Sequence, residues 1–260
     1  MITGNTASGT FYVFNKKEQS IPIVFVHGVG LTYEIWQPQL DFFNGYSNLS
    51  YDILGHGKSS LTKQNISFDD FSDQLIELIN ELKIEKIHLV GFSIGSLIAR
   101  NFATRYGDRL RSLILLGSIY KRSEQQQKIV NERFNQAKKE LKLSRQALKR
   151  WFTDKYLENN PGTYEKISSI LSKNNMTNFL KVYELFVKHK NDEDFKKIQT
   201  KTLVMTGEHD IGSTIEMSQQ LNNVIMDSEL KIIKEGKHLC GIECADEVNL
   251  SIKNFIDKHE

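Results

Sequence analysis

The sequence predicts an α/β fold with a mostly parallel central sheet and helices on both of its faces. Apolar runs such as IPIVFVHG (21–28), KIHLVGFS (86–93) and LRSLILLGS (110–118) lack polar alternation, which is typical of strands buried on both faces. Segments with helical spacing separate these runs. Strands joined by single helices at this spacing form a parallel sheet with crossover helices.

The remaining elements follow in order along the chain. Ser67 and Asp70 form a capping-box pattern at the start of a helix whose apolar residues share one face. The run LSYDILGHG (49–57) ends in glycines, which mark a turn after a strand. Further strands are expected at 9–15, 49–57 (a weaker pattern), 201–210 and 229–239, and helices at 67–82, 94–106, 214–225 and 245–258.

One stretch interrupts the alternation of strands and helices. Residues 121–197 show no convincing strand pattern, but Val130, Phe134, Ala137 and Leu141 have helical spacing. We therefore predict an α/β core made of residues 1–120 and 198–260. Residues 121–197 are expected to form a helical lid inserted into this core.

Composition limits the classes of protein that this chain resembles. A chain of 260 residues with 39% hydrophobic and 25% charged residues is typical of a globular protein with one sizeable core. Its net charge of +2 gives no reason to expect nucleic acid as a partner. We also expect no membrane span and no signal peptide, because no apolar run is long enough and the start lacks a basic, then apolar, leader.

The cysteine content points to a reducing compartment. Cys240 and Cys244 are the only cysteines, so no disulfide framework is expected, and a cytoplasmic location is predicted. A structural zinc site usually needs four ligands, and two thiols after one histidine are more simply small buried residues. We expect neither a metal ion nor a cofactor.

The motif that carries chemistry is Gly-Phe-Ser-Ile-Gly at 91–95. It lies where a buried strand meets a helix, which is the context that a presented serine nucleophile requires. A sharp turn there strains the backbone of Ser93 and lifts its hydroxyl clear of the sheet. Glycines at 91 and 95 are needed because larger side chains would collide at such a turn.

A serine becomes a nucleophile only when a base takes its proton and an acid orients that base. Among seven histidines, His238 is the candidate base, because it follows the last predicted strand in EGKHLCG. TGEHD ends the preceding strand and offers Asp210 as the acid, with Glu208 as a competitor. The order is therefore Ser93, Asp210, His238.

With these motifs the chain resembles the α/β-hydrolase superfamily, in the branch of small serine carboxylesterases and lactonases. HGVGLTYEIWQPQL (27–40) is similar to the family's His-Gly loop, DILGHGKS (52–59) to its Asp turn and GFSIG to its nucleophile elbow. The resemblance implies an oxyanion hole formed by the backbone N–H groups of Val29 and Ile94. It also implies hydrolysis of a carboxylic ester, thioester or lactone through an acyl-enzyme.

The inserted segment suggests two further expectations. Its aromatic residues are candidates for the substrate pocket, in particular Trp151, Phe152, Tyr183 and Phe186. Residues 121–155 contain eleven Lys or Arg and four Asp or Glu, an excess that suits either a solvated helix face or an acidic partner. An acyl carrier protein or a coenzyme A ester would be such a partner, and a methyl esterase acting on a carrier-linked substrate is one specific case.

Two alternatives remain open at this point. The same fold supports acyl transfer, carbon–carbon cleavage and cofactor-free oxygenation. A ligand receptor that turns over slowly is the other alternative. The identity of the acyl and alcohol groups, and the oligomeric state, do not follow from the sequence.

Overall fold

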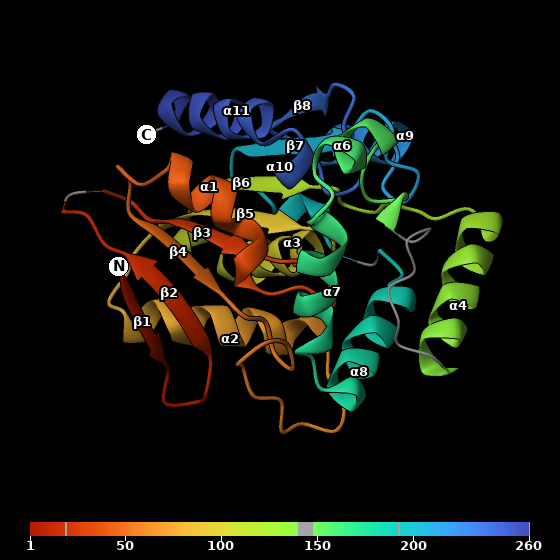
Figure 1. The fold of residues 1–260 in the computed structure, drawn as a ribbon. Coiled ribbons are helices and arrows are strands. Elements are labelled where there is room, and N and C mark those ends of the chain that lie inside the picture. Colours follow the sequence, from red (N-terminus) through yellow and green to blue (C-terminus); the bar gives the residue numbers. More distant parts are fainter. Residues whose placement is uncertain (19, 140–147, 192, 260) are drawn as a thin grey trace.

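In the computed structural model the described residues form one eight-stranded sheet, in the order β1-β2-β4-β3-β5-β6-β7-β8 (Figure 1). The structure describes residues 1–18, 20–139, 148–191 and 193–259. The pairs β1–β2 and β2–β4 are antiparallel, and all pairs from β4 across to β8 are parallel. The strands are β1 (Ile2–Asn5), β2 (Phe11–Asn15), β3 (Ile23–Val26), β4 (Asn48–Tyr51), β5 (Ile87–Phe92), β6 (Leu110–Leu116), β7 (Thr202–Gly207) and β8 (Ser228–Ile233). The predicted α/β class with a mostly parallel sheet is confirmed.

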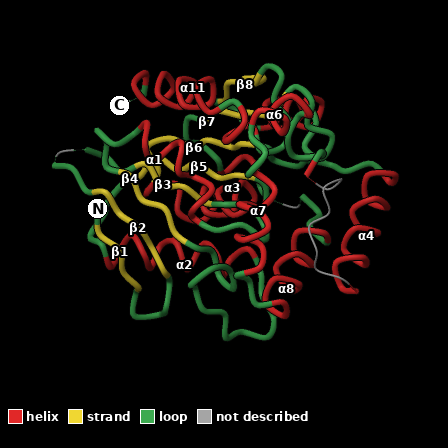
Figure 2. The backbone as a smooth tube through the Cα atoms, in the orientation of Figure 1, coloured by secondary structure: helices red, strands yellow, loops and turns green. Residues whose placement is uncertain are grey.

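Helices cover both faces of this sheet (Figure 2). Along β3, Val24 and Val26 join the buried cluster beneath α2, α3 and α9, whereas Ile23 and Phe25 join the cluster beneath α1 and α11. Strand side chains alternate between faces, so an entirely apolar strand supplies both cores. The helices are α1 (Gln37–Phe42), α2 (Phe68–Glu81), α3 (Ile94–Tyr106), α9 (Ile215–Val224), α10 (Cys240–Glu243) and α11 (Ala245–Lys258), with short 3₁₀ turns at Tyr33–Trp36, Gly107–Arg109 and Phe195–Lys197.

The predicted elements agree with the structure in place and type, and differ mainly at their ends. α3 and α11 have the predicted bounds, and Ser67 caps α2 with the predicted capping box. The predicted strands are longer than the observed ones because they include turn residues at one or both ends of each strand. β1 was not predicted, since its sequence ITGN is short, polar and mostly exposed.

Between β6 and β7 the described chain is helical. It contains α4 (Glu124–Lys139), α6 (Asp154–Asn159), α7 (Thr163–Ser172) and α8 (Met176–Val187), which we call the β6–β7 segment. These helices lie beside the carboxyl ends of β5 and β6 (Figure 1). Leu141 of the predicted helical pattern lies outside the described residues. No helix in the described ranges is long and apolar enough to cross a membrane.

Candidate active site

Ser93 occupies a strained turn between β5 and α3. Its backbone has φ 55° and ψ −118°, a region that residues other than glycine rarely adopt. A Cβ atom at Gly91 would lie 2.3 Å from the Gly95 carbonyl oxygen, and one at Gly95 would lie 2.3 Å from the Val26 carbonyl oxygen. The two glycines therefore permit the close approach that lets the turn present its serine.

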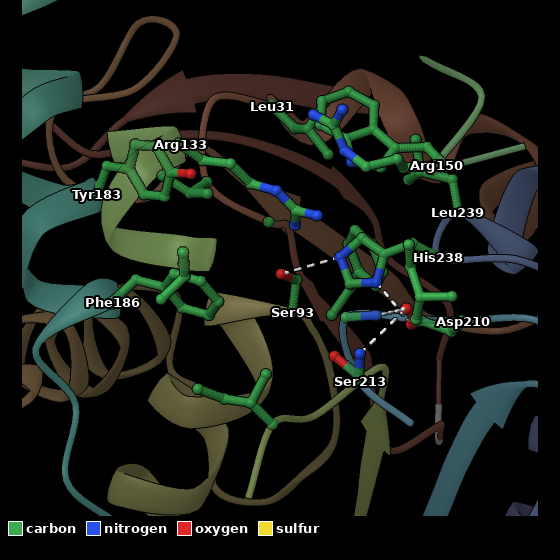
Figure 3. A pocket seen from close by; sticks show the side chains of 18 of the residues that line it. Leu31, Ser93, Arg133, Arg150, Tyr183, Phe186, Asp210, Ser213, His238 and Leu239 are labelled. Carbon is green, nitrogen blue, oxygen red and sulfur yellow. Dashed lines mark hydrogen bonds and ion pairs between the residues drawn. The ribbon is translucent and has the colours of Figure 1, made fainter. Parts of the chain in front are cut away.

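The structure brings Ser93, His238 and Asp210 into one hydrogen-bonded row (Figure 3). His238 Nε2 lies 3.3 Å from Ser93 Oγ, and His238 Nδ1 lies 2.7 Å from Asp210 Oδ2. Because an ionised carboxylate only accepts hydrogen bonds, Nδ1 carries the proton and Nε2 is left as the acceptor for the serine hydroxyl. This is the protonation pattern that a general base needs.

Asp210 is fixed by its own loop. Its Oδ1 accepts the backbone N–H groups of Gly212 (2.8 Å) and Ser213 (3.0 Å), which leaves Oδ2 for His238. Glu208, the competing acid, instead accepts the backbone N–H of Glu235 at 3.0 Å and is exposed. Of the two candidate acids, Asp210 is therefore the one that contacts the histidine.

The two backbone amides expected at the oxyanion hole lie next to Ser93. Val29 lines the same cavity as Ser93, and Ile94 is the first residue of α3. Neither N–H donates to another described residue, and the first amides of a helix have no acceptor within it. Both donors are thus free for a ligand, as far as the described residues show.

Two buried histidines hold the loop that carries Val29. His56 Nε2 accepts the Gly30 N–H at 2.8 Å, and His27 Nε2 accepts the Ile53 N–H at 3.1 Å while its Nδ1 lies 2.8 Å from the Gly28 carbonyl oxygen. Accepting at Nε2 requires a neutral ring. Burial accordingly lowers the pKa of His27 to about 4 and that of His56 to about 3.

A cavity of about 330 Å³ contains Ser93 and His238 in its wall, at the small end of the range of ligand pockets. Its apolar lining comes from the core and from the β6–β7 segment, and includes Leu31, Phe92, Trp151, Phe179, Phe186 and Leu239. The Leu239 N–H donates to the Trp151 carbonyl oxygen at 3.0 Å, which ties this segment to the loop of His238. A small, largely apolar substrate portion fits such a cavity.

Comparison with known proteins assigns the chain to a family. The model of the alpha/beta hydrolase fold family matches residues 21–243. The chain belongs to the α/β-hydrolase fold family.

Relatives of this α/β hydrolase carry out several reactions. It is 28% identical to (E)-2-((N-methylformamido)methylene)succinate hydrolase of Acinetobacter baylyi, over 95% of this chain and 94% of that protein. It is 26% identical to a non-heme chloroperoxidase of Kitasatospora aureofaciens, over 97% of this chain and 98% of that protein. The solved enol-lactonase of Burkholderia xenovorans shares its fold with a TM-score of 0.89 at 22% identity, over 98% of this chain and all of that one.

The pocket residues expected from the sequence of this α/β hydrolase divide into two groups. Trp151, Tyr183 and Phe186 line the cavity. Phe152 is not among the described residues that line it: its side chain is fully buried in the core and stacks on Tyr156, with ring centroids 5.0 Å apart. Adjacent residues point in different directions, so Trp151 and Phe152 have different surroundings.

Sequence reasoning missed the charged part of the lining. Arg122, Arg133 and Arg150 lie in the wall of the cavity (Figure 3 labels the last two). They belong to the basic excess of residues 121–155, which is the only sequence signal that could have indicated them. The sequence motifs also gave no indication that His56 holds the loop of Val29.

The described cysteines do not form a reactive pair. Cys240 is fully buried, and burial raises the pKa of its thiol. Burial also raises the pKa of Cys244 to about 11. Since the thiolate is the reactive form, both side chains are inert packing groups at neutral pH.

The buried histidines predict an acid-sensitive fold. Unfolded, each histidine would titrate near pH 6.5, whereas the folded pKa values of His27 and His56 are about 4 and about 3. The unfolded chain therefore takes up more protons below pH 6.5. The contribution of these histidines to the free energy of unfolding is wholly present above pH 6.5. It falls as the pH drops toward 4, by roughly 2 kcal/mol per histidine between pH 6.5 and 5.

Urea unfolding at pH 7 and pH 5 measures this loss. Asp52 opposes part of it, because burial raises the pKa of its carboxyl to about 6. His56→Gln keeps a side-chain acceptor for the Gly30 N–H but cannot take up a proton. The loss of unfolding free energy between pH 7 and pH 5 should therefore be smaller in this variant, by about the contribution of one histidine. His209→Gln, at an exposed position, is the matched control and should leave the pH dependence of the unfolding free energy unchanged. An equal pH dependence in all three proteins would contradict the assignment.

Proposed function

We propose that this protein is a serine hydrolase that cleaves a carboxylic ester, thioester or lactone through an acyl-enzyme intermediate. The observation that carries the proposal is the row of hydrogen bonds from Asp210 through His238 to Ser93, at the wall of a small apolar cavity. The strained backbone of Ser93 adds to it, because such strain is typical of a presented nucleophile.

The reaction follows from the positions of the donors and acceptors. Ser93 Oγ attacks the substrate carbonyl while His238 Nε2 takes the hydroxyl proton. The oxyanion that forms accepts the N–H groups of Val29 and Ile94, and Asp210 stabilises the imidazolium through Nδ1. His238 then returns the proton to the leaving oxygen or sulfur. Water, deprotonated by His238, attacks the acyl-enzyme, releases the acid and restores Ser93.

The names of the relatives support a hydrolase over other reactions of the family without excluding them. One relative is named as a hydrolase of a succinate derivative and a structural neighbour as an enol-lactonase, whereas another relative is named as a chloroperoxidase. Hydrolysis needs only water as a co-substrate. Product analysis with oxygen excluded separates it from oxygen-dependent chemistry.

A fluorophosphonate probe tests the nucleophile directly. It should label wild-type protein at one residue, Ser93, because its hydroxyl contacts His238 in the wall of the cavity. Ser112 also contacts a histidine, His88, at 2.8 Å, but both side chains are buried within the sheet and do not line the cavity. Peptide mapping by mass spectrometry identifies the labelled residue. Label on another serine, or no label on the folded protein, would contradict the proposal. Turnover of 4-nitrophenyl esters of graded acyl length would then give no evidence for a catalytic triad.

The acidic carrier partner stays a prediction. Of the basic residues that would dock it, Lys142 and Arg145 lie outside the described residues. Lys138, Lys139 and Lys149 are exposed, whereas Arg150 lines the cavity. A carrier would therefore meet the exposed lysines, and Arg150 would meet the substrate itself.

A further inference from the structure

Two arginines bring positive charge into the cavity, and neither has an acidic partner among the described residues. Arg133 of α4 and Arg150 extend into it from opposite sides of the view, toward the space above Ser93 (Figure 3). Within the described ranges, neither guanidinium forms a hydrogen bond or an ion pair with another residue. Both side chains are half-buried, so water screens them only in part.

The third arginine of the lining, Arg122, has a structural role. Arg122 donates from Nη1 to the carbonyl oxygens of Phe186 and Val187, both at 3.2 Å, and from Nη2 to that of Phe186 at 3.3 Å. These carbonyl oxygens lie at the carboxyl end of α8, where a cation is favourable. Arg122 thus binds carbonyl oxygens of the protein, whereas no described residue accepts a hydrogen bond from Arg133 or Arg150.

No acid of the described lining offsets the two charges. Asp210 is the only carboxylate among those residues, and its oxygens already accept three hydrogen bonds from His238, Gly212 and Ser213. Burial, and then the positive charge of Arg133, lower the pKa of Arg150. Two like charges that approach each other in a partly dry site are unfavourable unless an anion joins them.

We propose that the substrate is an ester, thioester or lactone that also carries a carboxylate, and that Arg133 and Arg150 hold this carboxylate between them. Planar guanidinium groups match the two oxygens of a carboxylate, and such charge-assisted pairs are both strong and directional. The assignment rests on the proposed function, since it places the reacting carbonyl at Ser93.

The size of the cavity limits the distance between the two ends of such a substrate. A volume of about 330 Å³ that includes Ser93 and both arginines in its wall admits a short acid, in which a few bonds separate the carboxylate from the ester. The apolar lining between them suits a methylene or vinyl link. The substrate class is therefore a short-chain half-ester, or a lactone with a carboxylate side chain.

A matched pair of probes tests this assignment. The carboxylate probe is the mono-4-nitrophenyl ester of adipic acid, and the neutral probe is 4-nitrophenyl hexanoate, with the same number of acyl carbons. Wild-type kcat/KM should be higher for the adipate ester. Arg133→Gln and Arg150→Gln should each lower kcat/KM for the adipate ester about 10- to 100-fold, the scale for a hydrogen bond to a charged group, and change the hexanoate value less than threefold.

The control variants separate charge in the cavity from charge on the surface. Lys128→Gln removes a positive charge from the exposed side of α4 and should leave both probes unchanged. Arg150→Lys keeps the charge but loses the planar fork, so it should fall between wild type and Arg150→Gln. Equal losses on both probes would overturn the carboxylate assignment, as would a wild-type enzyme with no preference.

A second measurement does not depend on turnover or on variants. Adipate dianion should slow fluorophosphonate labelling of Ser93 in the wild-type protein, and hexanol should not. If inorganic phosphate protects and adipate does not, the anion is misassigned. If adipate gives no protection, the arginine pair is not a carboxylate site. If the probe does not label Ser93 at all, it is the proposed function that fails.

Discussion

Ser93→Ala is expected to lower kcat by about 10⁶-fold, the scale found when the nucleophile of a serine triad is removed. The loss is large because His238 has no hydroxyl to deprotonate, and no acyl-enzyme can form. Steady-state hydrolysis of 4-nitrophenyl hexanoate measures it. Substrate binding should persist, since the arginine pair and the apolar lining are unchanged.

The fold of this variant should survive. Among the described residues, the Ser93 hydroxyl forms a hydrogen bond with His238 alone, at 3.3 Å, and alanine adopts the backbone region of φ 55° no worse than serine does. Circular dichroism and the thermal midpoint should therefore match those of wild type. A folded Ser93→Ala protein that keeps more than one hundredth of the wild-type kcat would exclude Ser93 as the nucleophile.

Asp210→Asn is expected to lower kcat by about 10⁴-fold, the scale for amide replacement of a triad aspartate. The surrounding bonds explain why. The N–H groups of Gly212 and Ser213 hold the Oδ1 position, so the amide oxygen stays there and its NH₂ turns to His238. The histidine must then accept at Nδ1, which places its proton on Nε2, where it cannot serve as the base for Ser93.

Glu208→Gln is the matched control for this prediction. Glu208 lies two residues before Asp210 and contacts the backbone of Glu235 instead of His238. Its kcat should change less than tenfold, measured with the same ester and with the thermal midpoint checked for both variants. The reverse order of effects in two folded proteins would assign the acid to Glu208.

The sequence was sufficient for the parts of the site that local structure fixes. A glycine, serine and glycine at the junction of a buried strand and a helix can adopt few backbone conformations, so GFSIG specifies the strained turn of Ser93 by itself. Asp210 and His238 follow strands β7 and β8, which pair in parallel and end at the same edge of the sheet. Parallel order therefore brings these two loops together before any side chain is placed.

Side-chain direction within the β6–β7 segment was beyond sequence reasoning. Trp151 and Phe152 are adjacent aromatic residues, yet one lines the cavity and the other is buried against Tyr156. The basic excess of residues 121–155 likewise gave no sign that Arg133 and Arg150 turn inward while Lys138 and Lys139 turn outward. Helical spacing fixes which residues share a face, but the contacts between helices decide what that face meets.

By itself, the sequence determined the parallel sheet, the serine turn and which loops carry the proposed nucleophile, acid and base, because each depends on residues that are neighbours in the chain or ends of neighbouring strands. Only the tertiary structure decided that Asp210 rather than Glu208 contacts His238, and that His56 holds the loop of Val29. It also decided that two arginines face Ser93 with no acidic partner among the described residues. These depend on distances between segments far apart in the chain, which hydrophobic periodicity and motif spacing leave open.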